Sequence, residues 1–395
     1  MIDFNYSNPA KIIFGRNAEK HVGQEIAGCA RKVLIVVGGD FIYKTGLYGQ
    51  VTSSFEELGL SFLDFDRVTS NPKMSGIEEG IRVAREAGVD FVLAIGGGSA
   101  IDTAKCIAAG VKAKKPLWHY FENFTDFITD ALPVGVILTL PASGSEVSHV
   151  AVATHDESGQ KRSLFSPLLI PRFACMNPEL GATLPAEQLA YGSFDAFSHL
   201  VEMYFTKAES TLVTDCVLEG AMRSLVLIAE RLALGERSYD LMAELFLAAN
   251  LANNGILSVG RGAGDWGSHN IGHELSSAYN LPHGLSLALV MPAWMRLISR
   301  RDPGTIAQLL GRVFLGWQMT EPASEEDEQE LIERGLEAFA VFIERLKLPA
   351  RLGDAGVPEN ALPALAASAL DGRQGIGMCY ELSEEDVRTI LELAY

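Results

Sequence analysis

Cysteine is scarce in this sequence and is not arranged in pairs. Five cysteines occur in 395 residues, and no two of them form a C-x-x-C motif. A disulfide framework and a zinc finger are therefore excluded as the basis of the fold. Scattered thiols in odd number are typical of a reducing compartment, and we expect the protein to be cytoplasmic.

Long apolar segments and an excess of basic residues are also missing. The most apolar stretches, residues 33–37 and 134–140, are too short to cross a bilayer, and the first residues lack the pattern of a signal peptide. Acidic residues outnumber basic ones by 50 to 32, which gives a formal net charge of −18. Such a surface repels phosphate backbones and anionic lipids. We therefore expect no nucleic acid and no membrane as partner, and a small-molecule substrate instead.

The composition is that of a packed globular protein, with 48% apolar and 21% charged residues. No segment repeats with a period of 20–50 residues, and none is of low complexity. At about 150 residues per domain, the length predicts two or three domains. The sequence changes character near residue 183, and we place the predicted boundary there.

Residues 1–183 are predicted to form an α/β domain. Short aliphatic runs stop at glycine or proline, as buried parallel strands do, and segments with helical apolar spacing lie between them. The expected strands are residues 33–37, 91–95 and 134–140. The expected helices are residues 51–58 and 99–109. This order indicates βαβ units and therefore a parallel, Rossmann-like sheet.

Residues 184–395 carry no further strand signal and are predicted to form an all-α domain. Their apolar residues recur at helical spacing. The windows with this spacing are residues 187–205, 212–231, 238–257, 265–277 and 285–297.

A glycine-rich turn at 96–99 (GGGS) joins an expected strand to an expected helix. Without side chains the backbone can approach a phosphate closely, and the helix N-terminus offers N–H groups to it. Asp102, in the first helical turn, could bond to a ligand hydroxyl. The turn matches neither G-x-G-x-x-G nor the Walker A motif. Spacing alone therefore leaves phosphate binding and an ordinary tight turn equally open.

Three further features of the first domain could contact a dinucleotide. Gly38 and Asp40 end the first strand, where an acid can accept hydrogen bonds from ribose hydroxyls and repel a 2′-phosphate; Asp40 could equally cap the next segment. Thr139 and Ser143 place hydroxyls after the third strand, as many loops do. Lys161 could meet a phosphate or ribose, although a lone lysine is more often a surface residue.

Acidic and histidine residues of the helical domain have the spacing of metal ligands. Asp195 and His199 are four residues apart, as are His269 and His273, so each pair shares one helix face. His283 follows ten residues after His273. One carboxylate with three or four imidazoles suits a divalent transition metal. Either pair alone arises more often by chance on ordinary helices, and their combination in one domain leaves a metal site and a chance arrangement equally open.

Taken in order, these motifs resemble those of the iron-containing (group III) alcohol dehydrogenases, above all their butanol dehydrogenase and aldehyde reductase branch. The matched features are GGGSAIDTAK at 96–105, SGSE at 143–146, Asp195-x-x-x-His199, HNIGHEL at 269–275 and PHG at 282–284. They lie at family-like spacing over nearly the whole chain. The resemblance implies a dehydroquinate synthase-like architecture with a cleft between two domains, and a homodimer.

The resemblance also implies roles for single residues. It implies a divalent metal, Fe²⁺ first, held by Asp195, His199, His269 and His283. These ligand types alone do not separate Fe²⁺ from Zn²⁺, Ni²⁺ or Mn²⁺. His273 is then the histidine that holds no metal and lies near the nicotinamide and substrate, and its unperturbed pKa of about 6.5 suits proton transfer.

NAD(P) would lie over the glycine turn, with Thr139, Ser143 and Lys161 lining it as in the family. The predicted cofactor-binding residues are Gly38, Asp40, Gly96, Gly97, Gly98, Ser99, Asp102, Thr139, Ser143 and Lys161. The family usually has Thr in place of Ser143, a change that keeps the hydroxyl. The butanol branch usually has GGGS where this chain has GGDF at 38–41. The acid in that turn favours NAD(H) over NADP(H).

The predicted function is metal-dependent transfer of a hydride between NAD(P)(H) and a small primary alcohol or aldehyde. The metal would act as a Lewis acid on the substrate oxygen, and the cofactor would supply the redox chemistry. One alternative is a glycerol dehydrogenase-like or dehydroquinate synthase-like enzyme on the same fold, which the Asp-plus-three-His spacing disfavours. Another is a non-catalytic nucleotide or metal sensor, which the intact ligand set disfavours.

Overall fold

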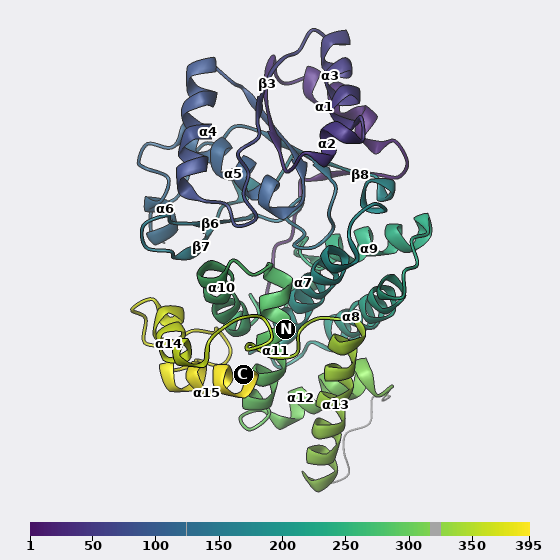
Figure 1. The fold of residues 1–395 in the computed structure, drawn as a ribbon, viewed down its shortest axis with the longest axis vertical. Helices are drawn as coiled ribbons and strands as arrows, with labels where there is room; N and C mark the ends of the chain where they lie inside the picture. Colours follow the sequence, from purple (N-terminus) through teal and green to yellow (C-terminus); the bar gives the residue numbers. More distant parts are fainter. Residues whose placement is uncertain (124, 317–324) are drawn as a thin grey trace. The chain divides into compact units, whose positions relative to one another are not determined.

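The computed structural model describes residues 1–123, 125–316 and 325–395. Its internal contacts divide the chain into two units (Figure 1). The sheet unit comprises Ser7–Leu184 and Ser238–Asn254, and the helical unit comprises Met1–Tyr6, Pro185–Arg237 and Gly255–Tyr395. The predicted domains, residues 1–183 and 184–395, divide the chain at a single point, whereas each unit combines separate segments. The predicted limits stay a proposal.

Six parallel strands form the sheet of the sheet unit, in the order β1-β8-β5-β4-β2-β3. They are β1 (Lys11–Phe14), β2 (Lys32–Val37), β3 (Ser61–Phe65), β4 (Phe91–Gly96), β5 (Val134–Leu138) and β8 (Phe173–Met176). An antiparallel hairpin of β6 (Val150–Thr154) and β7 (Lys161–Phe165) stands apart from this sheet. The predicted parallel α/β fold is confirmed, and the three expected strands are β2, β4 and β5.

Helices connect the strands, as right-handed crossovers between parallel strands require. They are α1 (Val22–Ala27), α2 (Phe41–Lys44), α3 (Leu47–Glu57), α4 (Met74–Ala87), α5 (Gly98–Lys112) and α6 (His119–Glu122). The unit also contains α9 (Tyr239–Leu251), which follows the last strand in the sequence and connects no two strands. Short 3-10 turns occur at Ala18–His21, Pro167–Leu169 and Pro178–Gly181. Helix α5 contacts β4, β2 and β5, and α4 packs on α5.

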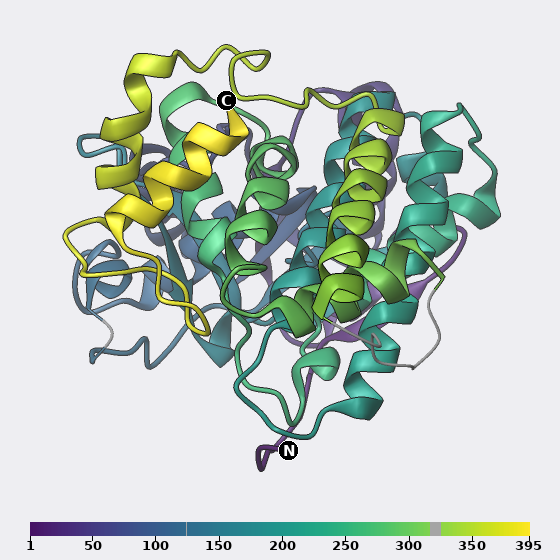
Figure 2. The same cartoon turned by 90° about the horizontal axis from the view of Figure 1, so that it is seen from below.

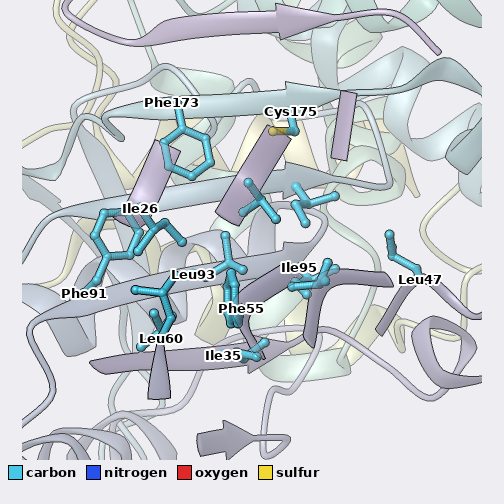
Figure 3. Packing of buried hydrophobic residues seen from close by; sticks show 14 of the residues in the cluster. Ile26, Ile35, Leu47, Phe55, Leu60, Phe91, Leu93, Ile95, Phe173 and Cys175 are labelled. Carbon is cyan, nitrogen blue, oxygen red and sulfur yellow. The ribbon is translucent and has the colours of Figure 1, made fainter. Parts of the chain in front are cut away.

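One face of the sheet packs against α1 and α3. Alternate residues of β4, namely Phe91, Leu93 and Ile95, point into this layer (Figure 3), because successive side chains of a strand point to opposite faces. They meet Ile26 from α1 and Phe55 from α3, and all five side chains are fully buried. The sheet is thus covered on both faces, which explains why its central strands are apolar throughout.

The helical unit is built around one apolar helix. Its helices are α7 (Ala186–Tyr204), α8 (Leu212–Ala233), α10 (Gly267–Tyr279), α11 (His283–Ile298), α12 (Pro303–Phe314), α13 (Glu325–Arg345), α14 (Leu362–Leu370) and α15 (Glu384–Ala394). Short 3-10 turns lie at Ile256–Ser258 and Glu359–Ala361. Helix α11 contacts α7, α10 and α15 (Figures 1 and 2), and most of its residues are buried. The predicted helical character after residue 184 is confirmed.

Several expected helices differ from the structure at their ends, among them those at 238–257 and 265–277. The window 238–257 ends as α9 at Leu251, and α9 belongs to the sheet unit. The helix expected at 265–277 is α10, which begins two residues later, at Gly267. The reason is that Trp266 has a left-handed backbone (φ 66°) and lies outside the helix. In the described part of the chain, no helix combines the length and apolar character needed to cross a membrane.

Candidate metal centre and nucleotide-binding turn

Helix α7 presents three acidic or histidine side chains on one face. Asp195 and His199 are one helical turn apart, and Glu202 follows one turn later. All three are buried within a helix that is otherwise largely apolar. Polar side chains in such surroundings are retained where they have partners or a ligand.

The starts of α10 and α11 bring two histidines to the same place. His269 lies in the first turn of α10, and His283 is the first residue of α11. The imidazole rings of His199 and His269 are 4.9 Å apart between centroids, and those of His269 and His283 are 5.4 Å apart. His283 Nε2 lies 3.8 Å from Asp195 Oδ1. The structure thus brings together all four predicted metal ligands.

A glycine after His283 makes this arrangement possible. A Cβ atom at Gly284 would collide with the carbonyl oxygen of Tyr191 in α7. The first turn of α11 can therefore lie directly against the backbone of α7 only with glycine at this position. The sequence PHG is explained by this contact: Pro282 precedes the helix, His283 begins it, and Gly284 permits the close approach.

The donor set fits a divalent transition metal. One potential ligand atom each from Asp195, His199 and His269 lies within 4.8 Å of the others. Burial, and secondarily the neighbouring His269, lowers the pKa of His199 well below its usual value, so its imidazole is neutral, as a ligand must be. Among the residues that the structure describes, His199 Nδ1 is buried without a hydrogen-bond partner. A carboxylate with neutral imidazoles is the ligand chemistry of Fe²⁺ or Zn²⁺ sites.

His273 lies beside this cluster, one turn after His269 on α10. Its ring is 5.1 Å from that of His283 and 6.5 Å from that of His269, and it is half-buried. The shared helix face expected from the sequence is thus present. The three residues with mutually close ligand atoms do not include it.

Glu202 is a site residue that the sequence analysis missed. Its carboxylate accepts hydrogen bonds from Ser268 Oγ at 2.6 Å and from His269 Nδ1 at 3.0 Å. Burial raises the pKa of Glu202 to about 7. The spacing Asp195-x-x-x-His199-x-x-Glu202 was the available signal, because it continues the same helix face by one turn.

In the sheet unit, the glycine turn lies at the carboxyl end of β4, where ligands of open parallel sheets bind. A Cβ at Gly96 would lie 2.7 Å from the Cβ of Ala100, and one at Gly98 would lie 2.6 Å from Ser143 Oγ. Gly97 is the N-cap of α5, and no side chain of the described residues caps this helix. The first N–H groups of α5 thus suit an anion. Gly38 packs beside Ala100 in the same way.

The other predicted cofactor residues have varied surroundings. Asp40 is exposed at the N-cap position of α2, and within the described chain its side chain makes no cap hydrogen bond. Thr139 is buried, and its backbone N–H bonds to Gly96 O. Ser99 Oγ donates to Ser70 O at 2.6 Å. Lys161 Nζ donates to Asn71 Oδ1 at 3.0 Å.

Asp102 and Ser143 belong to the contacts that hold the loop after β5. The carboxylate of Asp102 accepts from Ser145 Oγ at 2.6 Å and from the N–H of Val152 at 3.1 Å. Ser143 O accepts from Asn253 Nδ2 at 2.7 Å. These contacts show Asp102 joining α5 to the loop and to β6; a direct bond from Asp102 to a cofactor stays a prediction.

Lys105 is a second residue that the sequence analysis did not single out. It is fully buried on α5, and its ammonium group donates to Ser145 Oγ at 3.0 Å, Ser148 O at 2.9 Å and Val150 O at 2.8 Å. Burial lowers the pKa of Lys105 to about 8. This lysine therefore ties the helix behind the glycine turn to the loop at 143–150.

We expect Lys105→Met to lower the free energy of unfolding substantially, because each buried acceptor left without a donor costs about 1–3 kcal/mol. Above pH 8 and up to about 10.4, the ordinary lysine pKa, the unfolded wild-type chain binds more protons than the folded one. The stability difference between wild type and variant should therefore grow as the pH rises through this window. Urea denaturation near neutrality and at about pH 9.5 measures both effects. Lys112→Met, exposed on the same helix, is the control, and equal stability of the Lys105 variant and wild type at both pH values would contradict the role.

Comparison with known proteins identifies the family. The family model for iron-containing alcohol dehydrogenase matches residues 9–178, and the C-terminal model of the Fe-containing alcohol dehydrogenase family matches residues 189–395. The chain belongs to the iron-containing alcohol dehydrogenase family, and it is an oxidoreductase of that family. The resemblance stated from the motifs is confirmed, as is the predicted enzyme class over the glycerol dehydrogenase-like and sensor alternatives.

Similar proteins are of the expected branch. The chain is 35% identical over 398 residues to a probable NADH-dependent butanol dehydrogenase 1 of Bacillus subtilis, with 99% of each chain covered. It is 34% identical over 397 residues to the NADPH-dependent aldehyde reductase YqhD of Escherichia coli, with 100% of each covered. The crystal structure of NADH-dependent butanol dehydrogenase A from Thermotoga maritima matches with a TM-score of 0.93 and 36% identity, over 100% of this chain and 99% of that one.

Proposed function

We propose that the protein interconverts a small aldehyde and the corresponding primary alcohol, with NAD(H) as the preferred cofactor and Fe²⁺ as the metal. The observation that carries the proposal is the cluster of one carboxylate and three imidazoles from α7, α10 and α11, in which Asp195, His199 and His269 are buried and His283 is half-buried. The similarity to a probable butanol dehydrogenase and to an aldehyde reductase supports the substrate class.

The chain's residues divide the work between the two units. Asp195, His199, His269 and His283 would hold the metal, and the first turn of α5 would receive the cofactor pyrophosphate at its uncapped N–H groups. When bound, the metal supplies a Lewis acid and the cofactor supplies or accepts the hydride. His273 would give the proton that aldehyde reduction consumes and take it back in alcohol oxidation. This assigns residues 1–183 to cofactor binding and residues 184–395 to the metal and the catalytic histidine.

The test is steady-state reduction of butanal with NADH. Protein stripped by a chelator should lose turnover and recover it when Fe²⁺ or Zn²⁺ is returned. The proposal fails if the metal-loaded protein does not turn over aldehydes or alcohols, or if the stripped protein keeps full turnover.

We expect NADH to be preferred over NADPH because of Asp40, the exposed acid just after β2. Two like charges about 4 Å apart repel by about 1 kcal/mol even in water, and by more near a protein surface. Asp40→Gly and the isosteric Asp40→Asn should both narrow or reverse the ratio of kcat/KM values for the two cofactors. Glu78→Gln, an exposed acid elsewhere in the sheet unit, is the control. A wild-type preference for NADPH would show that Asp40 does not face the 2′ position.

The partner and location proposals rest on the sequence. We propose a cytoplasmic homodimer that binds no nucleic acid and no membrane. The unpaired cysteines and the net charge of −18 support it, as does the resemblance to the family. Light scattering after size-exclusion chromatography tests the dimer, and a monomer at micromolar concentration would contradict it.

A further inference from the structure

Glu202 gathers four donors from one short segment. Besides Ser268 Oγ and His269 Nδ1, its carboxylate accepts the backbone N–H groups of Trp266 at 2.7 Å and His269 at 3.1 Å. Both oxygens are used, and the side chain is completely buried. All four donors lie in residues 266–269, at the start of the helix that carries one predicted metal ligand.

The main-chain contacts fix the beginning of α10. Trp266 is the N-cap residue and has φ 66°, a left-handed conformation that is unfavourable for a bulky side chain. Its indole has no acceptor that could cap the helix. Two carboxylates supply acceptors instead: Asp265 accepts the N–H of Gly267, and Glu202 in α7 accepts the N–H groups of Trp266 and His269, which a helix start leaves without an internal partner. The start of α10 is therefore held to the helix that carries Asp195 and His199.

The side-chain contact fixes the imidazole of His269. Glu202 Oε1 already accepts the hydroxyl of Ser268 and the backbone N–H of His269, so it is also the acceptor in the 3.0 Å contact and places a proton on Nδ1. In the neutral ring the lone pair is then on Nε2. Such a contact behind a ligand histidine sets its tautomer and orientation and raises its basicity.

We propose that Glu202 is the positioning residue of the metal site: it holds His269 in the Nδ1–H tautomer and locks residues 266–269 so that Nε2 is offered to a divalent cation. This inference rests on the proposed function, in which Asp195, His199, His269 and His283 bind the metal. Glu202 lies on α7, the helix that also carries Asp195 and His199. Helix α7 therefore sets the positions of three predicted ligands: Asp195 and His199 directly, and His269 through Glu202.

The first test measures metal affinity separately from folding. Chelator-treated wild type and Glu202→Gln are titrated with Co²⁺, whose absorption reports both affinity and coordination, and metal-free thermal unfolding is recorded for each. Glutamine keeps the size of the side chain but replaces one acceptor by an amide donor that faces an N–H group. The dissociation constant should rise about 10–100-fold, as for other partners of ligand histidines, with a changed Co²⁺ spectrum.

Glu219→Gln is the matched control, because Glu219 is also a buried glutamate of the helical unit but bonds to Tyr204 and Arg312. It should lower the unfolding temperature and leave the Co²⁺ affinity unchanged. If wild type binds no Co²⁺, the proposed function itself fails. If wild type binds and Glu202→Gln binds equally with the same spectrum, the positioning role is overturned while the metal site stands.

A second measurement needs no variant of Glu202. Nitrogen-15 spectra of metal-free wild type with labelled histidine distinguish the two tautomers, and the signals of His269 are assigned by their absence in His269→Asn. The Nδ1–H form is expected. A predominant Nε2–H form would overturn the proposal even if Glu202→Gln did not fold.

Discussion

Replacing His283 by alanine should remove most of the bound metal and most of the activity. Wild-type protein should carry about one divalent ion per chain, and the variant only a small fraction of that, because metal affinity depends on the complete set of ligands. His283 Nε2 lies 3.8 Å from Asp195 Oδ1. It is the predicted ligand that α11 contributes to the cluster. Elemental analysis after dialysis, with turnover of butanal and NADH, measures both effects.

The control for this change is His21→Ala, which removes an exposed histidine of the sheet unit. It should leave metal content and turnover unchanged. Full metal content in the His283 variant would show that the other residues suffice and that the ligand set is misassigned.

Replacing His273 by phenylalanine should lower kcat by about 10²–10⁴-fold, the usual effect of losing a positioned acid or base. The ring of His273 lies 5.1 Å from that of His283 and is half-buried, and in the proposed function it passes a proton without holding the metal. Metal content and NADH affinity should be kept. The dependence of kcat on pH should flatten near neutrality, because histidine side chains ordinarily change charge in that range and phenylalanine does not.

Measuring metal content, NADH affinity and kcat against pH on this one variant decides among three outcomes. Loss of the metal would show that His273 is itself a ligand. An unmoved pH profile with lower stability would show a packing role, and the proton would then travel by another route.

The central strands could be predicted from the sequence, and the outer strands could not. β2, β4 and β5 are continuous apolar runs because helices cover both faces of the sheet there. β1 and β3 contain exposed and polar residues, and β8 is only four residues long. Their place in the sheet depends on strands that are distant in the sequence. For example, β1 pairs with β8, and Lys11 lies opposite Phe173. No local pattern contains that information.

The candidate site also contains residues that could be predicted from the sequence and residues that could not. The predicted ligands were visible because histidine is rare and the i,i+4 spacing is local. Glu202 and Lys105 were missed because acidic and basic residues are common, and only burial distinguishes these two. Their partners lie far away along the chain, at Ser268 and at Val150. The left-handed Trp266, which delays the start of α10, likewise depends on the carboxylate that accepts its N–H.

Helix α9 has a consequence for how the chain can be assembled and recombined. It follows α7 and α8 in the sequence but belongs to the sheet unit, where Asn250 bonds to the buried Glu146 at 3.0 Å and Phe246 packs close to Gly181. On the ribosome, the sheet unit therefore cannot be completed until after Asp195 and His199 have been synthesised. A fragment ending at residue 184 would leave Glu146 without this partner. A chimera that takes its sheet unit from another family member must accordingly take residues 238–254 along with the N-terminal half.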